Sequence, residues 1–346
     1  MKVMLVAGEA SADKHAARVI EAIRRREPDA EFFGLGGPAM QAAGMQCHFS
    51  MQELDILRIK DALQRLIDLK KPDLLIPVDS PDFNMRLMPY AKARGVKVLY
   101  YIAPQAWAWR PGRASQLAQM TDGLAVIFPF EEEFFRSHGV NAHYVGHPFM
   151  ENPPELVQLS WPPKRVALLP GSRRQELSRM LEDMLAAKRI LDKRHPWLKW
   201  YLPLAPGLDR QVFDHIADDN IEIVGELPEV DLSLTKSGTV SFEMALRGVP
   251  EVICYRTSNL NYRLAKRFVK MEHIGMPNII LGRTVVPELI QHDLTPLNLA
   301  DRLTEFMNDS IKYMQVRTAF EELRAKLGNL KASEGVAAWA QAILTS

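Results

Sequence analysis

Short apolar runs alternate with longer amphipathic segments through most of this chain, and the alternation restricts the folds that it can adopt. Runs such as residues 3–7, 74–78 and 165–169 have the length of a buried strand rather than that of a helix. Strands that alternate with helices form parallel sheets with right-handed crossovers. The pattern therefore predicts an α/β fold, and because it restarts at Arg165 it predicts two Rossmann-like domains.

The expected strands divide between the two halves of the 346-residue chain. The first half carries them at 3–7, 31–35, 74–78, 96–102, 124–128 and 143–145. The second half carries them at 165–169, 200–203, 221–224, 232–234 and 251–254, and the pattern is helical from residue 295 onwards. Residues 149–164 are rich in Pro and lack periodicity, which indicates a linker between domains. Such sheets bind ligands beyond the carboxyl ends of their strands, so we expect the site in the cleft between the domains.

Charge, cysteine content and hydropathy argue against several classes of protein. The net charge of +1 gives the whole chain no bias toward nucleic acid or membrane, so any such bias must be local. Cys47 and Cys254 lie far apart, provide neither a disulfide framework nor metal-ligand spacing, and fit a reducing cytosol. No apolar run approaches the ~20 residues of a membrane span, and the chain enters a strand at once, so we expect neither a span nor a signal peptide.

The first candidate site is the turn Gly171-Ser172-Arg173, which joins the strand at 165–169 to a long helix. The first N–H groups of a helix are unpaired and carry partial positive charge, and small residues let an anion approach them. Arg173 or Arg174 can add charged donors, so the turn can cradle a diphosphate. An ordinary turn with a solvated arginine explains this stretch equally well.

A second turn of the same kind, Ser237-Gly238-Thr239, follows the strand at 232–234. Glu243 lies one helical turn further on and could accept hydrogen bonds from a ribose. Alone, the turn is explained by a plain helix cap at Thr239 or Ser241. Two such turns in one domain favour a nucleotide, although the chain has neither a Gly-x-Gly-x-x-Gly fingerprint after its first strand nor a P-loop.

Two carboxylates, Asp79 and Asp82, end the buried strand at 74–78. A carboxylate at this edge of a parallel sheet is well placed to accept a proton from a substrate hydroxyl. We expect this chemistry of Asp79 and a helix cap from Asp82, and no metal, because no third ligand stands nearby. In the same way, Ser11 or Asp13 is expected to cap a helix that begins at about Lys14.

Aromatic and basic residues supply further candidates. Trp107, Trp109 and Arg110 follow a strand and could stack on a sugar or face an acyl chain, but domain packing is equally open. His147 is a lone loop histidine and is expected to be structural. Helical spacing of basic residues predicts a basic amphipathic helix that carries Arg263, Lys266, Arg267 and Lys270. Such a helix suits an anionic membrane surface or a phosphorylated substrate. A solvated face over a core stripe is an alternative of equal weight.

Taken together, ordered motifs over nearly the whole chain resemble the lipid-A-disaccharide synthase family, whose members have the two-Rossmann GT-B fold. Any one motif is weak, but the ordered set is specific. The matching stretches are Val6 to Asp13, Gly36-Gly37-Pro38-Ala39-Met40, Asp79 to Asn84, Pro104 to Arg110, Phe128-Pro129-Phe130-Glu131, Val145-Gly146-His147-Pro148, Leu169 to Arg173, Thr235 to Thr239 and Met276-Pro277-Asn278.

The resemblance implies an activity and a set of roles. The family joins UDP-2,3-diacylglucosamine to 2,3-diacylglucosamine 1-phosphate, UDP leaves, the anomeric centre inverts, and a β(1→6) disaccharide forms. It needs neither a cofactor nor a metal, so protein donors hold the diphosphate. Asp79 falls on the candidate general base. The substrate- and nucleotide-binding positions are Ser11, Asp13, Gly171, Ser172, Arg173, Ser237, Gly238, Thr239, Glu243 and Asn278.

The resemblance also implies an organisation of the chain and a location. Residues 1–155 would bind the acceptor, 156–324 the UDP-sugar, and the helices at about 325–346 would pack back on the first domain or on a partner subunit. The protein would be cytoplasmic and peripheral on the cytoplasmic face of the inner membrane, with no nucleic-acid partner; a homodimer is compatible with the resemblance.

This chain departs from the family pattern in three places. Ala12 and Ala103 replace a Gly and a Ser, and the apolar Met-Gly segment expected after Glu53-Leu54 is absent. Residues 225–231 are also too few for the helix expected there. Two alternatives therefore stay open: another UDP-sugar enzyme of the same fold, such as a UDP-GlcNAc 2-epimerase, and a sugar-nucleotide-binding protein with impaired catalysis.

Overall fold

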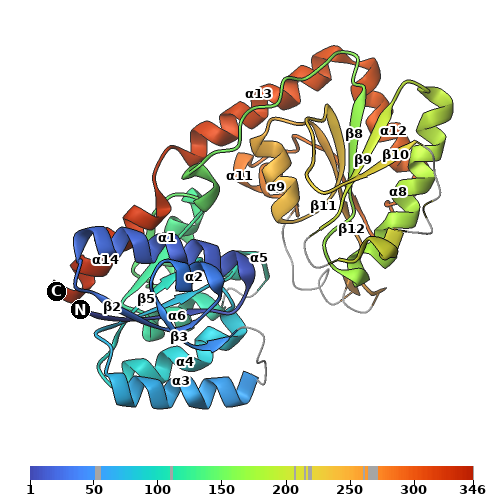
Figure 1. Ribbon diagram of the computed structural model, residues 1–346. Helices are drawn as coiled ribbons and strands as arrows, with labels where there is room; N and C mark the ends of the chain where they lie inside the picture. The colour runs from blue at the N-terminus through green and yellow to red at the C-terminus, as the bar shows by residue number, and fades with distance from the viewer. Residues whose placement is uncertain are drawn as a thin grey trace. The chain divides into compact units, whose positions relative to one another are not determined.

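The computed structural model describes residues 1–50, 56–109, 112–205, 208–213, 216, 220–259, 262–263 and 272–345. The chain forms two compact units (Figure 1). The first unit contains Met1–Asn152 together with Leu327–Ser346, and the second contains Pro153–Lys326. The last helix is thus part of the first unit although it is distant in sequence.

The first unit is built on a seven-stranded parallel sheet with the order β3-β2-β1-β4-β5-β6-β7. Apart from Lys2, the residues of the central strands β1 and β4 are buried, as expected for a sheet covered on both faces. In register, Met4 of β1 lies between Phe33 of β2 and Leu75 of β4. The strands are β1 (Lys2–Ala7), β2 (Glu31–Gly36), β3 (Gln46–Ser50), β4 (Leu74–Val78), β5 (Lys97–Tyr101), β6 (Gly123–Val126) and β7 (Ala142–Tyr144).

Helices cover both faces of this sheet (Figure 1). On one face, α1 (Ala10–Arg26) packs against α14 (Ala332–Thr345), which adds Val336, Ala337 and Ala340 to the core. The other face is covered by α3 (Ile56–Lys70), α4 (Pro81–Lys92) and α6 (Gly112–Met120), together with α7 (Pro129–Ser137). Short helices occupy the connections: α2 (Pro38–Ala42), α5 (Ala106–Trp109) and the 3₁₀ helix η1 (Pro148–Met150).

The second unit repeats this plan on a six-stranded parallel sheet with the order β10-β9-β8-β11-β12-β13. The strands are β8 (Arg165–Leu169), β9 (Lys199–Pro203), β10 (Ile221–Val224), β11 (Leu232–Lys236), β12 (Glu251–Tyr255) and β13 (Glu288–Ile290). Figure 1 shows α8 (Arg174–Arg194) and α12 (Pro296–Asn308) on one side, with α9 (Thr239–Leu246) and α11 (Met276–Leu281) on the other. The short η2 (Arg210–Phe213) and the long α13 (Ser310–Leu327) complete the unit.

The Pro-rich segment predicted to be a linker is bound along the second unit from residue 153 onwards. The buried carboxylate of Asp231 accepts hydrogen bonds from the N–H groups of Ser160 and Arg165, each at 2.9 Å. From α13, Arg317 donates to the carbonyl of Val157 at 3.1 Å and Arg324 to that of Pro154 at 2.8 Å. These contacts give the segment a fixed path despite its irregular sequence.

The sequence pattern missed three elements and misplaced the start of one. The strands β3 and β13 lie at sheet edges, where one side is unpaired and the polar sequence does not stand out. The helix α3 was missed because its many charged residues mask an apolar face that includes Leu63 and Ile67. The helix α1 begins at Ala10 rather than near Lys14, so Ser11 and Asp13 lie inside its first turn and neither caps it.

Candidate functional site

Each sheet contains one point at which the strand order reverses direction, and the predicted motifs lie at these points. In the first unit the reversal falls between β1 and β4, and in the second between β8 and β11. Asp79 directly follows β4, and Ser237 directly follows β11. Gly171 lies just beyond the end of β8. Open α/β sheets bind ligands beyond the carboxyl ends of strands at such switch points. The topology therefore brings the candidate residues of each unit to the place where that sheet can bind a ligand.

The backbone at Asp79 is held in an unusual conformation. Asp79 and Ser80 have φ angles of 52° and 46°, in the left-handed region that non-glycine residues rarely adopt. The Asp79 carbonyl accepts hydrogen bonds from the Tyr100 hydroxyl at 2.9 Å and from Asn84 Nδ2 at 2.6 Å. Its N–H donates to the Tyr101 carbonyl at 3.0 Å. Such strain persists only where surrounding contacts enforce it, and it is concentrated at functional sites.

The surroundings of Asp79 also alter its acidity. Burial raises the pKa of its carboxyl above the ordinary value, and the nearby negative charge of Glu9 adds to the increase. The N–H of Ser80 opposes the shift by donating to the carboxylate. A carboxylate with a raised pKa is a stronger base, which is the property that proton abstraction from a hydroxyl requires.

The structure corrects the role expected of Asp82. This residue lies in the first turn of α4, whose N-cap is Ser80 without a side-chain cap bond. Its carboxylate is 80% exposed and lies 2.5 Å from a guanidinium nitrogen of Arg113. Asp82 therefore forms a surface ion pair instead of capping the helix.

Ser11 and Asp13 differ from each other in their surroundings. Ser11 is exposed, whereas Asp13 is 3% exposed. The Asp13 carboxylate accepts hydrogen bonds from the N–H groups of Gly37 at 2.8 Å, Ala39 at 2.9 Å and Met40 at 3.1 Å. Asp13 thus satisfies the unpaired donors at the start of α2 and fixes the turn between β2 and that helix.

In the second unit, the turn Gly171-Ser172-Arg173 leads into α8 as the sequence predicts. Gly171 has a φ of 116°, which requires glycine. Arg173 is exposed and is the N-cap of α8. The N–H groups of Ser172 and Arg173 donate to Oε2 of Glu176, at 3.0 and 3.3 Å. A carboxylate therefore occupies the donors on which the predicted diphosphate site depends.

The second turn lies beside the first, because β8 and β11 are paired. Gly238 is the N-cap of α9 and no side chain caps this helix, so neither Thr239 nor Ser241 has the capping role considered as the alternative. Ser237 donates its hydroxyl to the carbonyl of Ile274 at 3.1 Å. Glu243 is half-buried and pairs with Arg247 at 2.9 Å. The exposed Thr239 and the backbone of Gly238 are thus the donors that this turn presents.

Asn278 has structural contacts rather than an available side chain. It is fully buried, and its Oδ1 accepts from the N–H groups of Val285 at 2.7 Å and Val286 at 3.1 Å. Its Nδ2 donates to Glu288 Oε1 at 2.7 Å. These bonds shape the loop between α11 and β13, so we omit Asn278 from the nucleotide contacts proposed below.

Trp107 contributes to packing in the first unit. Its indole N–H donates to Glu131 Oε1 at 2.9 Å, and its ring meets Phe130 edge-on at 5.0 Å. Burial raises the pKa of Glu131 to about 7, although Trp107 and two backbone N–H groups donate to its carboxylate. The side chain of Trp109 and the whole of Arg110 lie outside the described residues.

His147 is buried, as expected of a structural histidine. Its Nδ1 accepts a hydrogen bond from the N–H of Phe149 at 3.1 Å and its ring packs against Phe128. Burial lowers the pKa of His147 to about 3, and the neighbouring His15 contributes to the decrease. Of the basic helix, Arg263 is described and exposed, whereas Lys266, Arg267 and Lys270 lie outside the described residues.

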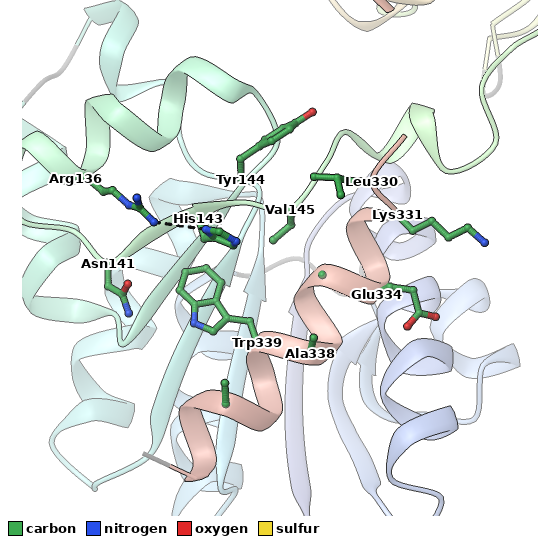
Figure 2. A pocket seen from close by; sticks show the side chains of 12 residues that line it. Arg136, Asn141, His143, Tyr144, Val145, Leu330, Lys331, Glu334, Ala338 and Trp339 are labelled. Atoms are coloured by element: carbon green, nitrogen blue, oxygen red, sulfur yellow. Dashed lines mark hydrogen bonds between the residues drawn. The ribbon is translucent and has the colours of Figure 1, made fainter. Parts of the chain in front are cut away.

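A cavity of about 660 Å³ lies alongside β7, the edge strand of the first sheet (Figure 2). Trp339 and Ala338 of α14 form one wall, and His143 of β7 meets the Trp339 ring edge-on at 5.8 Å. The N–H of Tyr144 is bound to Glu132 at 2.7 Å, so this strand edge is protected against addition of another strand. The cavity lies three strands from β4 and is separate from the switch point.

Comparison with known proteins identifies the family. The family model described as lipid-A-disaccharide synthetase matches residues 3–343. The lipid-A-disaccharide synthase of Geobacter metallireducens is 39% identical over 366 aligned positions, which cover 97% of this chain and 95% of the relative. The chain belongs to the lipid-A-disaccharide synthase family. The enzyme of Myxococcus xanthus, 36% identical with 96% and 94% coverage, supports the same assignment.

As a member of this family, the protein is a glycosyltransferase of the GT-B fold. Solved structures agree with this fold at low sequence identity. A UDP-GlcNAc 2-epimerase from Neisseria meningitidis, bound to UDP-GlcNAc, matches with a TM-score of 0.69 at 11% identity over 100% of both chains. MurG of Acinetobacter baumannii matches with a TM-score of 0.59 at 14% identity over 99% of both chains.

Proposed function

We propose that the chain joins UDP-2,3-diacylglucosamine to 2,3-diacylglucosamine 1-phosphate, with release of UDP and inversion at the anomeric carbon. The observation that carries this proposal is the position of Asp79, a partly buried carboxylate of raised pKa at the switch point of the first sheet. Membership of the family supports the choice of substrates. The second unit, with its paired turns, would bind the UDP moiety.

The proposed reaction assigns one role to each unit. The oxygen of the acceptor 6-hydroxyl forms the new bond to the anomeric carbon, and its proton passes to Asp79. The bond between that carbon and the diphosphate breaks, and its electron pair leaves with UDP. Backbone N–H groups and the charged side chain of Arg173 would stabilise the negative charge that develops on the leaving group.

A product assay tests this proposal directly. The protein is incubated with the two acylated glucosamine substrates, and the products are identified by mass and by the configuration of the new linkage. A β(1→6) disaccharide 1-phosphate together with UDP is the expected result. Epimerisation of unacylated UDP-GlcNAc would instead support the epimerase alternative, and sugar-nucleotide binding without turnover would support the impaired variant.

Arg173→Ala is expected to weaken UDP binding about tenfold or more, because each charge-assisted hydrogen bond to the diphosphate contributes roughly 1.5–3 kcal/mol. Isothermal titration calorimetry on folded protein measures the effect. Arg189→Ala removes the same charge from an exposed position further along α8 and serves as the matched control. Unchanged UDP affinity in Arg173→Ala would show that the diphosphate is bound elsewhere.

We further propose that the protein binds the cytoplasmic face of the inner membrane peripherally through Arg263, Lys266, Arg267 and Lys270. Among the described helices, none is long and apolar enough to cross a bilayer. Basic residues near an anionic surface contribute about 1 kcal/mol each, and salt screens them. In flotation with anionic vesicles, we expect binding at low salt that decreases with added salt and with charge reversal at Lys266 and Arg267. Vesicle binding that changes neither with added salt nor with charge reversal would refute this membrane-binding surface.

A further inference from the structure

The donors of the first turn in the second unit are already bound to a carboxylate of the same chain. Glu176 accepts from the N–H groups of Ser172 at 3.0 Å and of Arg173 at 3.3 Å. A Cβ placed on Gly171 would collide with Oε2 of Glu176. The carboxylate therefore lies directly on the turn, in the position that glycine leaves open.

A lysine from the second turn completes this arrangement. Nζ of Lys236, at the end of β11, lies 3.1 Å from Oε1 of Glu176. The same Nζ would lie 3.3 Å from a Cβ placed on Gly238. Both side chains are largely enclosed, with exposures of 24% for Lys236 and 19% for Glu176. One anion is thus bound by two N–H groups of the turn that leads into α8 and by a lysine, donors of the kind that recognise a phosphate.

The Glu176 carboxyl is held in its charged form. Burial works against the charge, but Lys236 and the N–H groups of Ser172 and Arg173 together keep its pKa below the ordinary value. An anionic ligand at this turn must therefore meet an existing negative charge. Two anions cannot share the same donors at contact distance without strong repulsion.

We propose that Glu176 is an internal competitor for the diphosphate of the sugar nucleotide, and that nucleotide binding displaces its carboxylate and transfers Lys236 to the diphosphate. This inference rests on the proposed nucleotide site in the second unit. Lys236 becomes an additional diphosphate-binding residue, adjacent to Ser237 but absent from the substrate- and nucleotide-binding positions that the family resemblance implies. Glu176 holds Lys236 between the two turns while the site is empty and releases it when the diphosphate arrives.

UDP titrations by calorimetry on the full chain test the proposal with four variants. Glu176→Gln removes the competing charge and is expected to bind UDP about two- to fivefold more tightly than wild type. Glu176→Asp withdraws the carboxylate by one methylene and should tighten binding about twofold. Lys236→Met is expected to bind about tenfold more weakly. Glu222→Gln, which removes an equal charge from the exposed face of β10, should bind as wild type does.

A second readout separates competition from a purely structural role. Glu176 also caps α8, so Glu176→Gln is expected to melt at a lower temperature without UDP while it binds UDP more tightly. If Glu176 had only a structural role, the variant would show both a lower melting temperature and a lower affinity for UDP. Suppose that the wild type binds UDP and that Arg173→Ala weakens this binding. Equal or weaker UDP binding in both Glu176 variants would then overturn the proposed competition by Glu176 but leave the nucleotide site in place. No UDP binding by the wild type would overturn both.

Discussion

Asp79→Asn is expected to reduce turnover by about 10²–10⁴-fold, the range that general-base assistance typically contributes. The acceptor hydroxyl is a poor nucleophile until a base accepts its proton, and the amide cannot do so. Asparagine adopts the left-handed conformation that this position requires more readily than most residues. The backbone bonds from Tyr100 and Asn84 should therefore persist, and the variant should remain folded.

Steady-state turnover measured beside a melting curve and a UDP titration checks this expectation. UDP affinity should stay nearly unchanged, because the proposed nucleotide contacts lie in the other unit. Asp82→Asn is the matched control, since an exposed ion pair contributes about 0–1 kcal/mol and its loss should change little. Near-normal turnover in Asp79→Asn, or a parallel loss of turnover and thermal stability, would end the assignment of Asp79 as the base.

The acidity of Asp79 adds a pH signature to the same experiment. The base acts only when deprotonated, so activity is lost as pH falls through its pKa. Because burial raises that pKa, the acid limb of kcat/KM should lie at a higher pH than an ordinary aspartate would give. The residual activity of Asp79→Asn should lack this limb, and persistence of the limb would assign it to another group.

The sequence predicted the central strands and the turns that follow them, since both depend on local signals. A short apolar run marks a buried parallel strand, and small residues mark the tight turn that ends it. In a doubly wound sheet, the turns that follow the two strands at the switch point lie side by side. This places the turns after β1 and β4 together in the first unit and those after β8 and β11 together in the second. Asp79 was proposed as the base because it directly follows a buried strand, and the family resemblance points to the same residue.

The partners of buried polar side chains could not be predicted in this way. Asp13 and Asn278 belong to family motifs, and motif membership does not distinguish a ligand contact from a bond that shapes the fold. The structure gives both residues backbone N–H donors from segments 7 to 27 residues away. Glu176 lies in α8 and Lys236 at the end of β11, so their ion pair joins residues that are distant in sequence. No periodicity or motif in the sequence indicates that these two side chains meet. Long-range polar contacts of this kind depend on tertiary placement rather than on periodicity.

The alignment with a relative also indicates that this chain lacks residues that other family members have. The match to the Geobacter metallireducens enzyme extends over 366 positions, more than the 346 residues of this chain, so the relative carries residues that this chain lacks. The short stretches at 55–71 and 225–231 agree with this difference. The strands β4, β8 and β11, which lead to Asp79, Gly171 and Ser237, are nonetheless present, so both switch points are intact.

Asp13→Ala is expected to destabilise the first unit by about 3 kcal/mol or more, because it leaves three N–H groups at the start of α2 without their acceptor. Each buried donor without a partner costs roughly 1–3 kcal/mol, and the 3% exposure of Asp13 gives water little access. Chemical denaturation measures the loss, and hydrogen exchange should show lost protection at Gly37, Ala39 and Met40.

Ser11→Ala provides the matched control, because it alters an exposed side chain in the same helical turn and should change stability by less than about 0.5 kcal/mol. The comparison separates the two roles available to Asp13. If its function is to anchor α2, Asp13→Ala lowers stability and its activity recovers at low temperature, where the folded fraction is restored. If Asp13→Ala is instead as stable as Ser11→Ala but binds the acceptor poorly, its carboxylate contacts substrate, and the anchoring bonds at Gly37, Ala39 and Met40 are dispensable for the fold.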